Sequence, residues 1–190
     1  MERLNIWLTS DLHFMHDKSF IWESRGFFSI QEMNEKIVEN WNNIVKPDDR
    51  VICLGDLMLN NNEEGIKYIN QLNGEIILIW GNHDTNARQE AIHLNCPSII
   101  TLGYAHQFRY EKFSIYLSHY PTITSNFDDK NFTYRTFNLH GHTHSLTPWI
   151  DPNNPFMYDV GMDAHNCKPI LIDNILDDIY YQWKKLKGDI

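Results

Sequence analysis

The sequence is short of positive charge and of long hydrophobic runs, and each shortage argues against a class of protein. Its 190 residues carry 16 Lys and Arg against 25 Asp and Glu, which gives a formal net charge of −9. This balance argues against tight nucleic-acid binding, because proteins that bind DNA or RNA present a basic face. No apolar run approaches the roughly 20 residues that a helix needs to cross a bilayer, so we expect no membrane partner.

Cysteine is also scarce. The three cysteines, Cys53, Cys96 and Cys167, stand apart and form no CxxC pair. An odd and sparse set is typical of a reducing compartment rather than of a disulfide framework. Residues 1–3 lead directly into a short apolar segment and do not resemble a signal peptide. We therefore expect a cytoplasmic protein.

What the chain does have is an ordinary globular composition and a surplus of histidine. Hydrophobic residues make up 42% of the sequence and charged residues 22%, as in folded proteins rather than disordered ones. The length fits a single domain over residues 1–190 with one sizeable core. The ten histidines are more than composition would suggest, and their placement is more informative than their number.

The first half of the chain alternates between strand and helix patterns. Short apolar segments at residues 4–9, 51–54 and 75–80 are typical of buried strands. A capping box at residues 29–32 opens a first helix, and residues 62–72 form a second helical pattern. This alternation predicts right-handed crossovers around a mainly parallel sheet.

The second half of the chain has a different pattern. Residues 107–118 indicate an antiparallel hairpin, and residues 136–139 indicate another strand. Residues 147–155 contain three prolines and are predicted to form a loop. A last strand at residues 169–172 leads to Asp173, which we expect to cap a final helix whose apolar face packs on a sheet.

Residues that carry chemistry follow five of these strands. The segments are Asp11-Leu12-His13, Gly55-Asp56, Gly81-Asn82-His83-Asp84, His119 and His140-Gly141-His142-Thr143-His144. One such segment is an ordinary turn, but five in series are not explained in that way. Because ligands of α/β sheets bind beyond the carboxyl ends of the strands, we expect these segments to converge on one site.

This ordered set of segments resembles the calcineurin-like metallophosphoesterase superfamily and spans positions 11 to 144. The chain is also similar to a compact bacterial and phage branch of that family, through its opening His13-Phe14-Met15-His16 and its late segment Val160-Gly161-Met162-Asp163. Met15 stands where that branch often has Gly, a departure that concerns the local backbone and not the ligands. The resemblance implies an α/β fold, a two-sheet mixed β sandwich flanked by helices in αββα order.

The resemblance also implies two divalent metal ions that share the carboxylate of Asp56. One ion would be bound by Asp11, His13, Asp56 and His144, and the other by Asp56, Asn82, His119 and His142. Ions about 3.5–4 Å apart need such a bridging oxygen ligand. A ligand set rich in imidazole favours the transition metals Mn, Fe, Zn or Ni over Mg or Ca.

A phosphoesterase reaction follows from the same resemblance. A hydroxide shared by the two ions would attack phosphorus in line, while the ions stabilise charge on the other phosphate oxygens. Two divalent ions outweigh the carboxylates of Asp11 and Asp56, so an acidic chain can still attract a small anionic phosphate ester. His83 is the candidate general acid, and Asp84 either orients His83 or caps the following helix.

Three further residues are candidate substrate contacts, each with an alternative. His16 lies one turn beyond the first ligand pair and would touch the phosphate or a carboxylate that supports the metal site. Arg25 lies in the loop before the first helix and is either a phosphate clamp or a solvated arginine. His140 precedes the Gly-His-x-His segment and either orients a ligand or packs at the strand end.

The sequence leaves more than one function open. The favoured reading is a phosphodiesterase or phosphomonoesterase that acts on small molecules. A nuclease or protein phosphatase ranks below it, because the chain has no evident basic stripe. A catalytically silent binding module ranks last, since every expected ligand and the expected acid are present. His165 is a weaker candidate for the site, and we expect His93 and His106 to be ordinary surface or helix residues.

Overall fold

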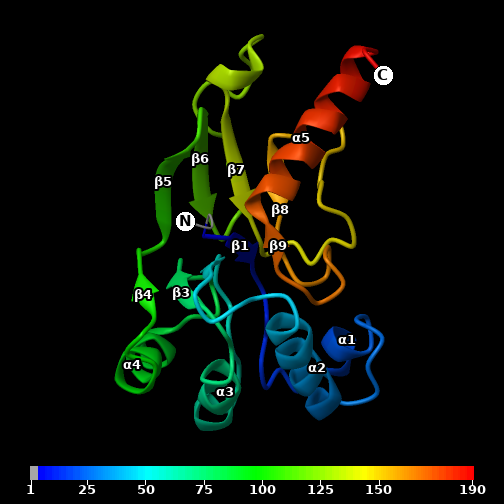
Figure 1. The fold of residues 1–190 in the computed structure, drawn as a ribbon. Coiled ribbons are helices and arrows are strands. Elements are labelled where there is room, and N and C mark those ends of the chain that lie inside the picture. The colour runs from blue at the N-terminus through cyan, green and yellow to red at the C-terminus, as the bar shows by residue number, and fades with distance from the viewer. Residues whose placement is uncertain (1–3) are drawn as a thin grey trace.

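Two β-sheets lie face to face, with helices flanking them (Figure 1). The structure is a computed structural model that describes residues 4–190. Residues 1–3, for which a signal peptide was not expected, lie outside the described part. The arrangement is the mixed α/β architecture that the resemblance implied, with two mixed sheets and flanking helices.

The first sheet has the strand order β4-β3-β2-β1-β9. Its strands are β1 (Ile6–Thr9), β2 (Arg50–Cys53), β3 (Glu75–Leu78), β4 (Ile100–Thr101) and β9 (Ile170–Leu171). Strands β1 to β4 run parallel, and β9 pairs antiparallel with β1. The mainly parallel sheet predicted from the alternating pattern is thereby confirmed.

The second sheet has the order β5-β6-β7-β8. Its strands are β5 (Ala105–Tyr110), β6 (Phe113–Ser118), β7 (Thr136–His140) and β8 (Met157–Asp159). The predicted hairpin is present as the antiparallel pair β5 and β6, whereas β6, β7 and β8 run parallel to one another.

The helices occupy two sides of this pair of sheets. They are α1 (Ser19–Trp22), α2 (Ile30–Asn42), α3 (Asn62–Ile69), α4 (Asn86–Asn95), the 3₁₀ helix η1 (Phe132–Tyr134) and α5 (Ile172–Lys187). In Figure 1, α2, α3 and α4 lie together below the first sheet and α5 lies above it, beside the second sheet. Helix α2 begins where predicted, because the Ser29 side chain accepts a hydrogen bond from the Glu32 amide.

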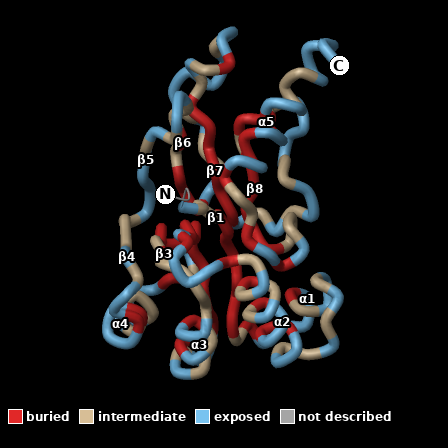
Figure 2. The backbone as a smooth tube through the Cα atoms, viewed as in Figure 1, coloured by how far each residue is buried: buried red, intermediate tan, exposed pale blue. Residues whose placement is uncertain are grey.

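Two clusters of buried side chains hold the layers together. The first joins α2, α3 and α4 to the outer face of the first sheet, with Trp41 and Leu78 among its fully buried members. The second lies between the sheets and includes Leu8, Phe137 and Ile175 of α5. Each such side chain stabilises the fold by roughly 1.5–3 kcal/mol. Figure 2 shows the buried backbone running along the central strands, and α5 packs on a sheet as expected.

Several features of the fold differ from the sequence-based expectations. Strands β4 and β8 were not predicted, because two and three residues are too few to establish an alternating pattern. Asp173 does not cap α5: the N-cap residue is Leu171, which makes no side-chain cap hydrogen bond. Helix α5 starts directly from β9, so Asp173 falls in its first turn, where the Tyr110 hydroxyl donates to it at 2.8 Å.

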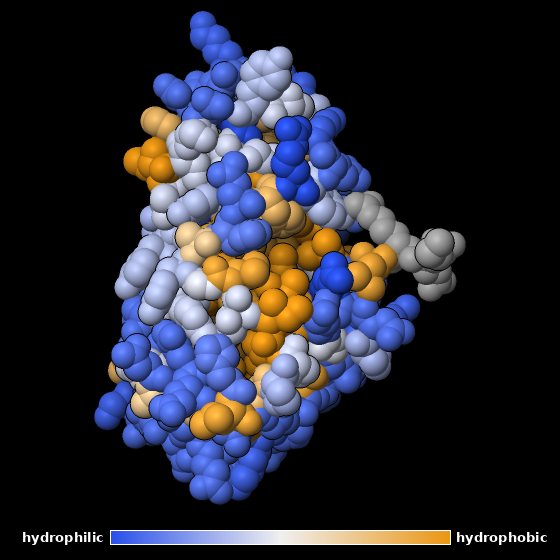
Figure 3. Space-filling model, turned by 90° about the vertical axis from the view of Figure 1, so that its left-hand side faces the viewer, coloured by the Kyte–Doolittle hydropathy of each residue, from blue (hydrophilic) through white to orange (hydrophobic). Residues whose placement is uncertain are grey.

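The surface at the side of β4 and β5 is apolar in its middle. Figure 3 shows hydrophobic side chains gathered midway down this face, between hydrophilic ends. Ile77 in β3 and Phe108 in β5 are partly buried members of the cluster between the sheets.

Every helix within residues 4–190 is too short or too polar to cross a lipid bilayer.

Candidate metal centre

The loops after β1 and β2 run side by side and bring three predicted ligands together. Asp11 and His13 follow β1, and Asp56 follows β2. The Asp11 amide donates to the Gly55 carbonyl at 3.0 Å, and the His13 amide donates to the Asp56 carbonyl at 3.0 Å. Parallel pairing therefore continues past the strand ends and fixes the register of the two loops.

Many of the candidate ligands have a strained backbone. The φ angles are 59° for Asp11, 56° for His13, 57° for Asp56, 71° for His142 and 49° for His144. This left-handed region is uncommon for residues other than glycine and costs of order 1–3 kcal/mol per residue. Met15 is also left-handed, at 64°, a conformation that glycine would adopt without strain. Strain gathered at one place in this way is typical of functional sites.

Gly81 and Gly141 allow the other loops to pack directly against the two carboxylates. A Cβ atom on Gly81 would overlap the Asp56 carboxylate, and one on Gly141 would overlap the Asp11 carboxylate. Both overlaps lie far inside van der Waals distance. The glycines of the Gly-Asn-His and Gly-His-x-His segments are thus required by close approach.

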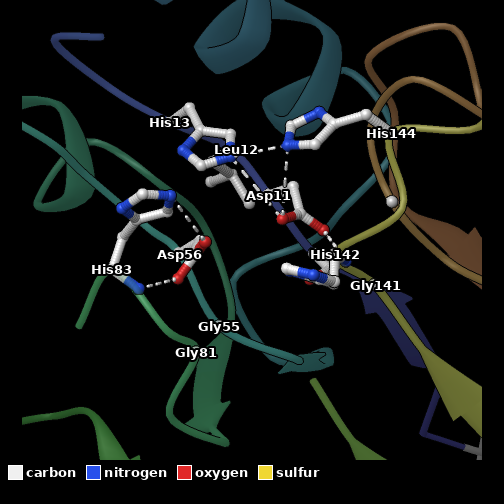
Figure 4. Close-up of polar contacts among 12 residues, drawn as sticks. Asp11, Leu12, His13, Gly55, Asp56, Gly81, His83, Gly141, His142 and His144 are labelled. Atoms are coloured by element: carbon white, nitrogen blue, oxygen red, sulfur yellow. Dashed lines mark hydrogen bonds and ion pairs between the residues drawn. The ribbon is translucent and has the colours of Figure 1, made fainter. Parts of the chain in front are cut away.

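One half of the site, the Asp11 half, consists of Asp11, His13 and His144. The Nε2 atoms of His13 and His144 lie 3.1 Å apart, and the two rings face one another near Asp11 (Figure 4). Oδ1 of Asp11 is 3.6 Å from the first nitrogen and 3.9 Å from the second, and it has no hydrogen-bond partner among the described residues. Two imidazole nitrogens and an unpaired carboxylate oxygen that converge in this way fit a metal ion with nitrogen and oxygen ligands.

The other half, the His119 half, consists of Asp56, Asn82, His119 and His142. Oδ1 of Asn82 lies 2.7 Å from Nε2 of His119 and 2.9 Å from Nδ1 of His142. Oδ2 of Asp56 lies 3.5 Å from the same Nε2 of His119. Nδ1 of His119 is 2.7 Å from the Leu54 carbonyl, so this nitrogen donates and Nε2 is left to bind a cation.

Within residues 4–190, two groups of side chains are close enough to hold a metal ion. The groups are Asp11, His13 and His144, and Asp11, Asp56 and His119. Within each group the ligand atoms lie within 4.8 Å of one another. Asp11 belongs to both groups, whereas the resemblance gives the bridging position to Asp56. The bridging role of Asp56 therefore stays a prediction.

Burial and neighbouring charges set the pKa values of these groups. Burial lowers the pKa of His13 to about 4, against the effect of Asp11, so His13 is a neutral imidazole at neutral pH. Burial would raise the pKa of Asp11, but the adjacent His13, with His119 and His144, holds it below its ordinary value. Burial raises the pKa of Asp56 to about 7, although His119 opposes the shift. A cation bound beside Asp56 would favour the charged carboxylate and so offset the effect of burial on its pKa.

Arg25 is a structural residue, and the predicted phosphate clamp is corrected. Its side chain is only 1% exposed, and it donates to both carboxylate oxygens of Asp163 at 3.0 and 2.8 Å. It also donates to the backbone carbonyls of Leu12 and Asp11 at 3.1 and 2.8 Å. Oδ2 of Asp163 in turn lies 2.9 Å from Nδ1 of His144. Arg25 thus supports the Asp11 half from inside the protein.

Asp84 joins two loops, which neither predicted alternative described. Its Oδ2 accepts hydrogen bonds from the amides of Asp56 at 2.9 Å and Gly81 at 2.7 Å. It does not cap α4, whose N-cap residue is Thr85, and its bonded carboxylate oxygen faces backbone amides instead of the His83 ring. Asp84 therefore positions Asp56 by holding the ends of β2 and β3 together.

His83 and His16 lie beside the Asp11 half, where an acid and a substrate contact are expected. Both line a cavity of about 560 Å³ that also includes His13 and His144. Nε2 of His83 is 4.0 Å from Oδ2 of Asp56, and the His83 amide donates to Oδ1 of Asp56 at 2.9 Å (Figure 4). The His16 ring is edge-on to the His13 ring, with centroids 5.4 Å apart.

His140 packs at the end of β7 and does not face a substrate. It is fully buried, and its Nδ1 lies 2.9 Å from the Gly141 carbonyl. Burial lowers its pKa to about 4, so the ring is neutral at ordinary pH. The packing alternative therefore describes His140, and the predicted substrate contact is corrected.

The remaining histidines do not join the site. Nε2 of His165 lies 2.8 Å from the Asp159 carbonyl, and its ring stacks on Tyr158. His93 and His106 are exposed, as expected. Sequence reasoning missed the role of Asp163, although the late Val-Gly-x-Asp segment that contains it was the signal that could have found it.

The sequence as a whole matches a known protein family. A family model described as calcineurin-like phosphoesterase matches residues 4–187. An uncharacterized protein of Methanocaldococcus jannaschii is 32% identical over 184 residues, which cover 93% of this chain and 92% of that protein. The gene 66 protein of Mycobacterium phage D29 is 28% identical over 189 residues, which cover 87% of this chain and 92% of that protein.

The fold is similar to that of a protein of unknown function from Aquifex aeolicus. The two structures superpose with a TM-score of 0.69 at 22% sequence identity. The match covers 92% of this chain and 99% of the other. At this level of identity the likeness concerns the fold alone.

Proposed function

Because the chain belongs to the calcineurin-like phosphoesterase family, we propose that it hydrolyses small phosphate esters with two bound divalent transition-metal ions. The observation that carries this proposal is the convergence of candidate ligands from five strand ends. In particular, two imidazole nitrogens lie 3.1 Å apart beside the buried carboxylate of Asp11. Such an arrangement has little structural value to an apo protein, since it leaves buried polar atoms unpaired.

The proposed ligand sets follow the two halves of the site. One ion would be bound by Asp11, His13, Asp56 and His144, and the other by Asp56, Asn82, His119 and His142. Asp56 would join the halves, which its position 3.5 Å from His119 and within 4.8 Å of Asp11 supports. The mixture of imidazole nitrogen with carboxylate and amide oxygen favours Mn, Fe, Zn or Ni.

The chain's own residues position the reacting groups. Bound ions would supply an activated hydroxide and stabilise charge on the phosphoryl oxygens. Asp84 holds Asp56 through the Asp56 amide, and Asp163 holds His144 through Nδ1. Both contacts fix the direction of a ligand before an ion or a substrate binds, which lowers the entropy cost of assembling the site.

His83 is the proposed general acid for the leaving group. Its side chain is partly exposed and lines the cavity beside the metal centre. Burial and then the charge of Arg88 lower the pKa of His83 in the free protein. A bound anionic ester would oppose that shift and favour the protonated ring that an acid needs.

The proposal is tested by metal-dependent turnover. Purified protein would be stripped of metal, reloaded with Mn, Ni, Fe or Zn, and assayed with bis(p-nitrophenyl) phosphate and with p-nitrophenyl phosphate. We expect hydrolysis only with added metal, and elemental analysis should give two ions per chain. The ratio of the two rates distinguishes a diesterase from a monoesterase. If no metal supports turnover of either ester, the protein is a binding module and the proposal is wrong.

A further inference from the structure

The cavity beside the Asp11 half has an apolar wall that the metal centre does not use. We call it the Phe20 cavity. Besides the histidines of the metal centre and His83, it is lined by His16, Phe20, Ile21, Ser24, Leu146 and Asp163. Its volume of about 560 Å³ is within the range of small-molecule sites.

Several polar atoms in the wall of this cavity already have partners. The Asp163 carboxylate is bonded to Arg25 and faces His144, and its side chain is only 4% exposed. The Ser24 hydroxyl donates to the Ile21 carbonyl at 2.8 Å. Nδ1 of His16 accepts from the Lys18 amide at 3.3 Å. The wall therefore offers few free groups to bind a sugar or a peptide.

The Phe20 cavity also lacks positive charge. Among the described residues that line it, none is Lys or Arg. Arg25, which follows Ser24 in the chain, is bonded to Asp163, and its side chain is only 1% exposed. Because a second phosphate needs a cation or a free donor, this cavity is unsuited to polyphosphate groups.

Large apolar and aromatic side chains remain at the rim. Phe20 is 65% exposed and Leu146 is 74% exposed, so both side chains are accessible to a ligand at the rim of the cavity. The Phe20 ring is edge-on to His16 at 5.7 Å, and His16 is edge-on to His13 at 5.4 Å. The His13 ring is in turn edge-on to the His83 ring, with centroids 5.7 Å apart. His13 and His16 are buried, so within this row the exposed Phe20 ring and the partly exposed His83 ring are accessible to another ring.

We propose that the Phe20 cavity binds an uncharged aromatic group on the phosphate ester, and that this group belongs to the leaving side. The side is assigned because His83, the proposed acid, lines the same cavity. This inference rests on the proposed function, and it narrows the substrate class to aromatic esters with one phosphate. Phe20 and Leu146 become the specificity-determining residues.

Binding of phosphonates tests the inference without requiring turnover. The affinities of benzylphosphonate and methylphosphonate for the metal-loaded protein would be measured by titration calorimetry. Burial of one aromatic ring predicts a preference of about tenfold or more for the benzyl compound. Phe20→Ala and Leu146→Ala should each reduce that preference several-fold. Phe28→Ala is the matched control, because Phe28 is 88% exposed and lies outside the cavity. It should leave the preference unchanged.

The outcomes separate this inference from the proposed function. Equal affinities for the two phosphonates, or no binding of either, would overturn the inference even if bis(p-nitrophenyl) phosphate is hydrolysed. A benzyl preference that depends on Phe20, found in a protein without turnover, would support the cavity and contradict the proposed function. A preference that Phe28→Ala reduces as much as Phe20→Ala does would also overturn the assignment of the cavity.

Discussion

The two halves of the site are held by different means. In the Asp11 half, His13 is buried and His144 is fixed through Asp163, which Arg25 neutralises inside the protein. In the His119 half, Asp56 is held by Asp84 and His119 by the Leu54 carbonyl, but Asn82 and His142 are exposed and contact one another. Both imidazoles of the Asp11 half are therefore fixed from inside the protein, whereas Asn82 in the His119 half contacts other candidate ligands, namely His119 and His142. We expect the first ion to bind more tightly in the Asp11 half.

The largest expected effect comes from removing the buried cation of the Asp11 half. Arg25→Met leaves the Asp163 carboxylate buried without its partner, and breaking such a pair costs about 3–5 kcal/mol. Urea denaturation of the metal-free protein would measure the change. Arg50→Met is the matched control, because its ion pair with Glu75 is exposed and worth about 1 kcal/mol at most. Equal losses in the two variants would show that Arg25 does not fix the Asp11 half more strongly than a surface ion pair would.

A second variant tests chemistry that belongs to neither half. His83→Ala should keep both ions by elemental analysis, since His83 is not among the proposed ligands. Loss of the proposed acid should slow esters with poor leaving groups by about a hundredfold. Esters of p-nitrophenol, whose leaving group needs little protonation, should be affected much less. A similar loss on both kinds of ester would remove His83 from that role.

Asp163→Asn sharpens the comparison at the level of metal binding. The amide keeps the shape of the side chain but removes the charge that faces Nδ1 of His144. Loss of such a supporting partner typically lowers metal affinity by about 10–100-fold. Calorimetric titration with Mn should show the loss in the tighter of two binding steps. If only the weaker step changes, the Asp11 half is not the better-fixed one.

The smallest expected effect lies in the His119 half. The Tyr120 ring is exposed but contacts His142 edge-on, with centroids 4.5 Å apart. An aromatic pair of this kind is worth about 0.5–1.5 kcal/mol, so Tyr120→Ala should weaken the second binding step by up to about tenfold. Tyr181→Ala, an exposed tyrosine on α5, is the control and should leave both steps unchanged. A loss confined to the first step would contradict the division of the site.

The sequence predicted where the strands end, and hence where the site lies. Asp11, Asp56 and His119 each follow a strand whose apolar pattern is short but clear, and parallel pairing of β1 with β2 brings the first two of these ends together. Gly81 and Gly141 were visible as parts of motifs, but the reason for them is the nearby carboxylates, which only the structure supplies.

Side-chain direction was beyond the sequence-based reasoning. Arg25 is close to the site, as expected, but its partner Asp163 lies 138 residues further along the chain. An arginine that points inward and one that points to solvent have the same local sequence pattern. Asp84 and Asp173 differ from their predictions for a similar reason, because each meets a hydrogen-bond partner from another element instead of a helix end.

The most direct test of the account is anomalous X-ray scattering from crystals of the Mn-loaded protein. We expect two anomalous peaks, one bound by Asp11, His13 and His144 and the other by Asn82, His119 and His142, with Asp56 in contact with both. A single peak, or a second peak remote from Asp56, would contradict a dinuclear centre at these strand ends.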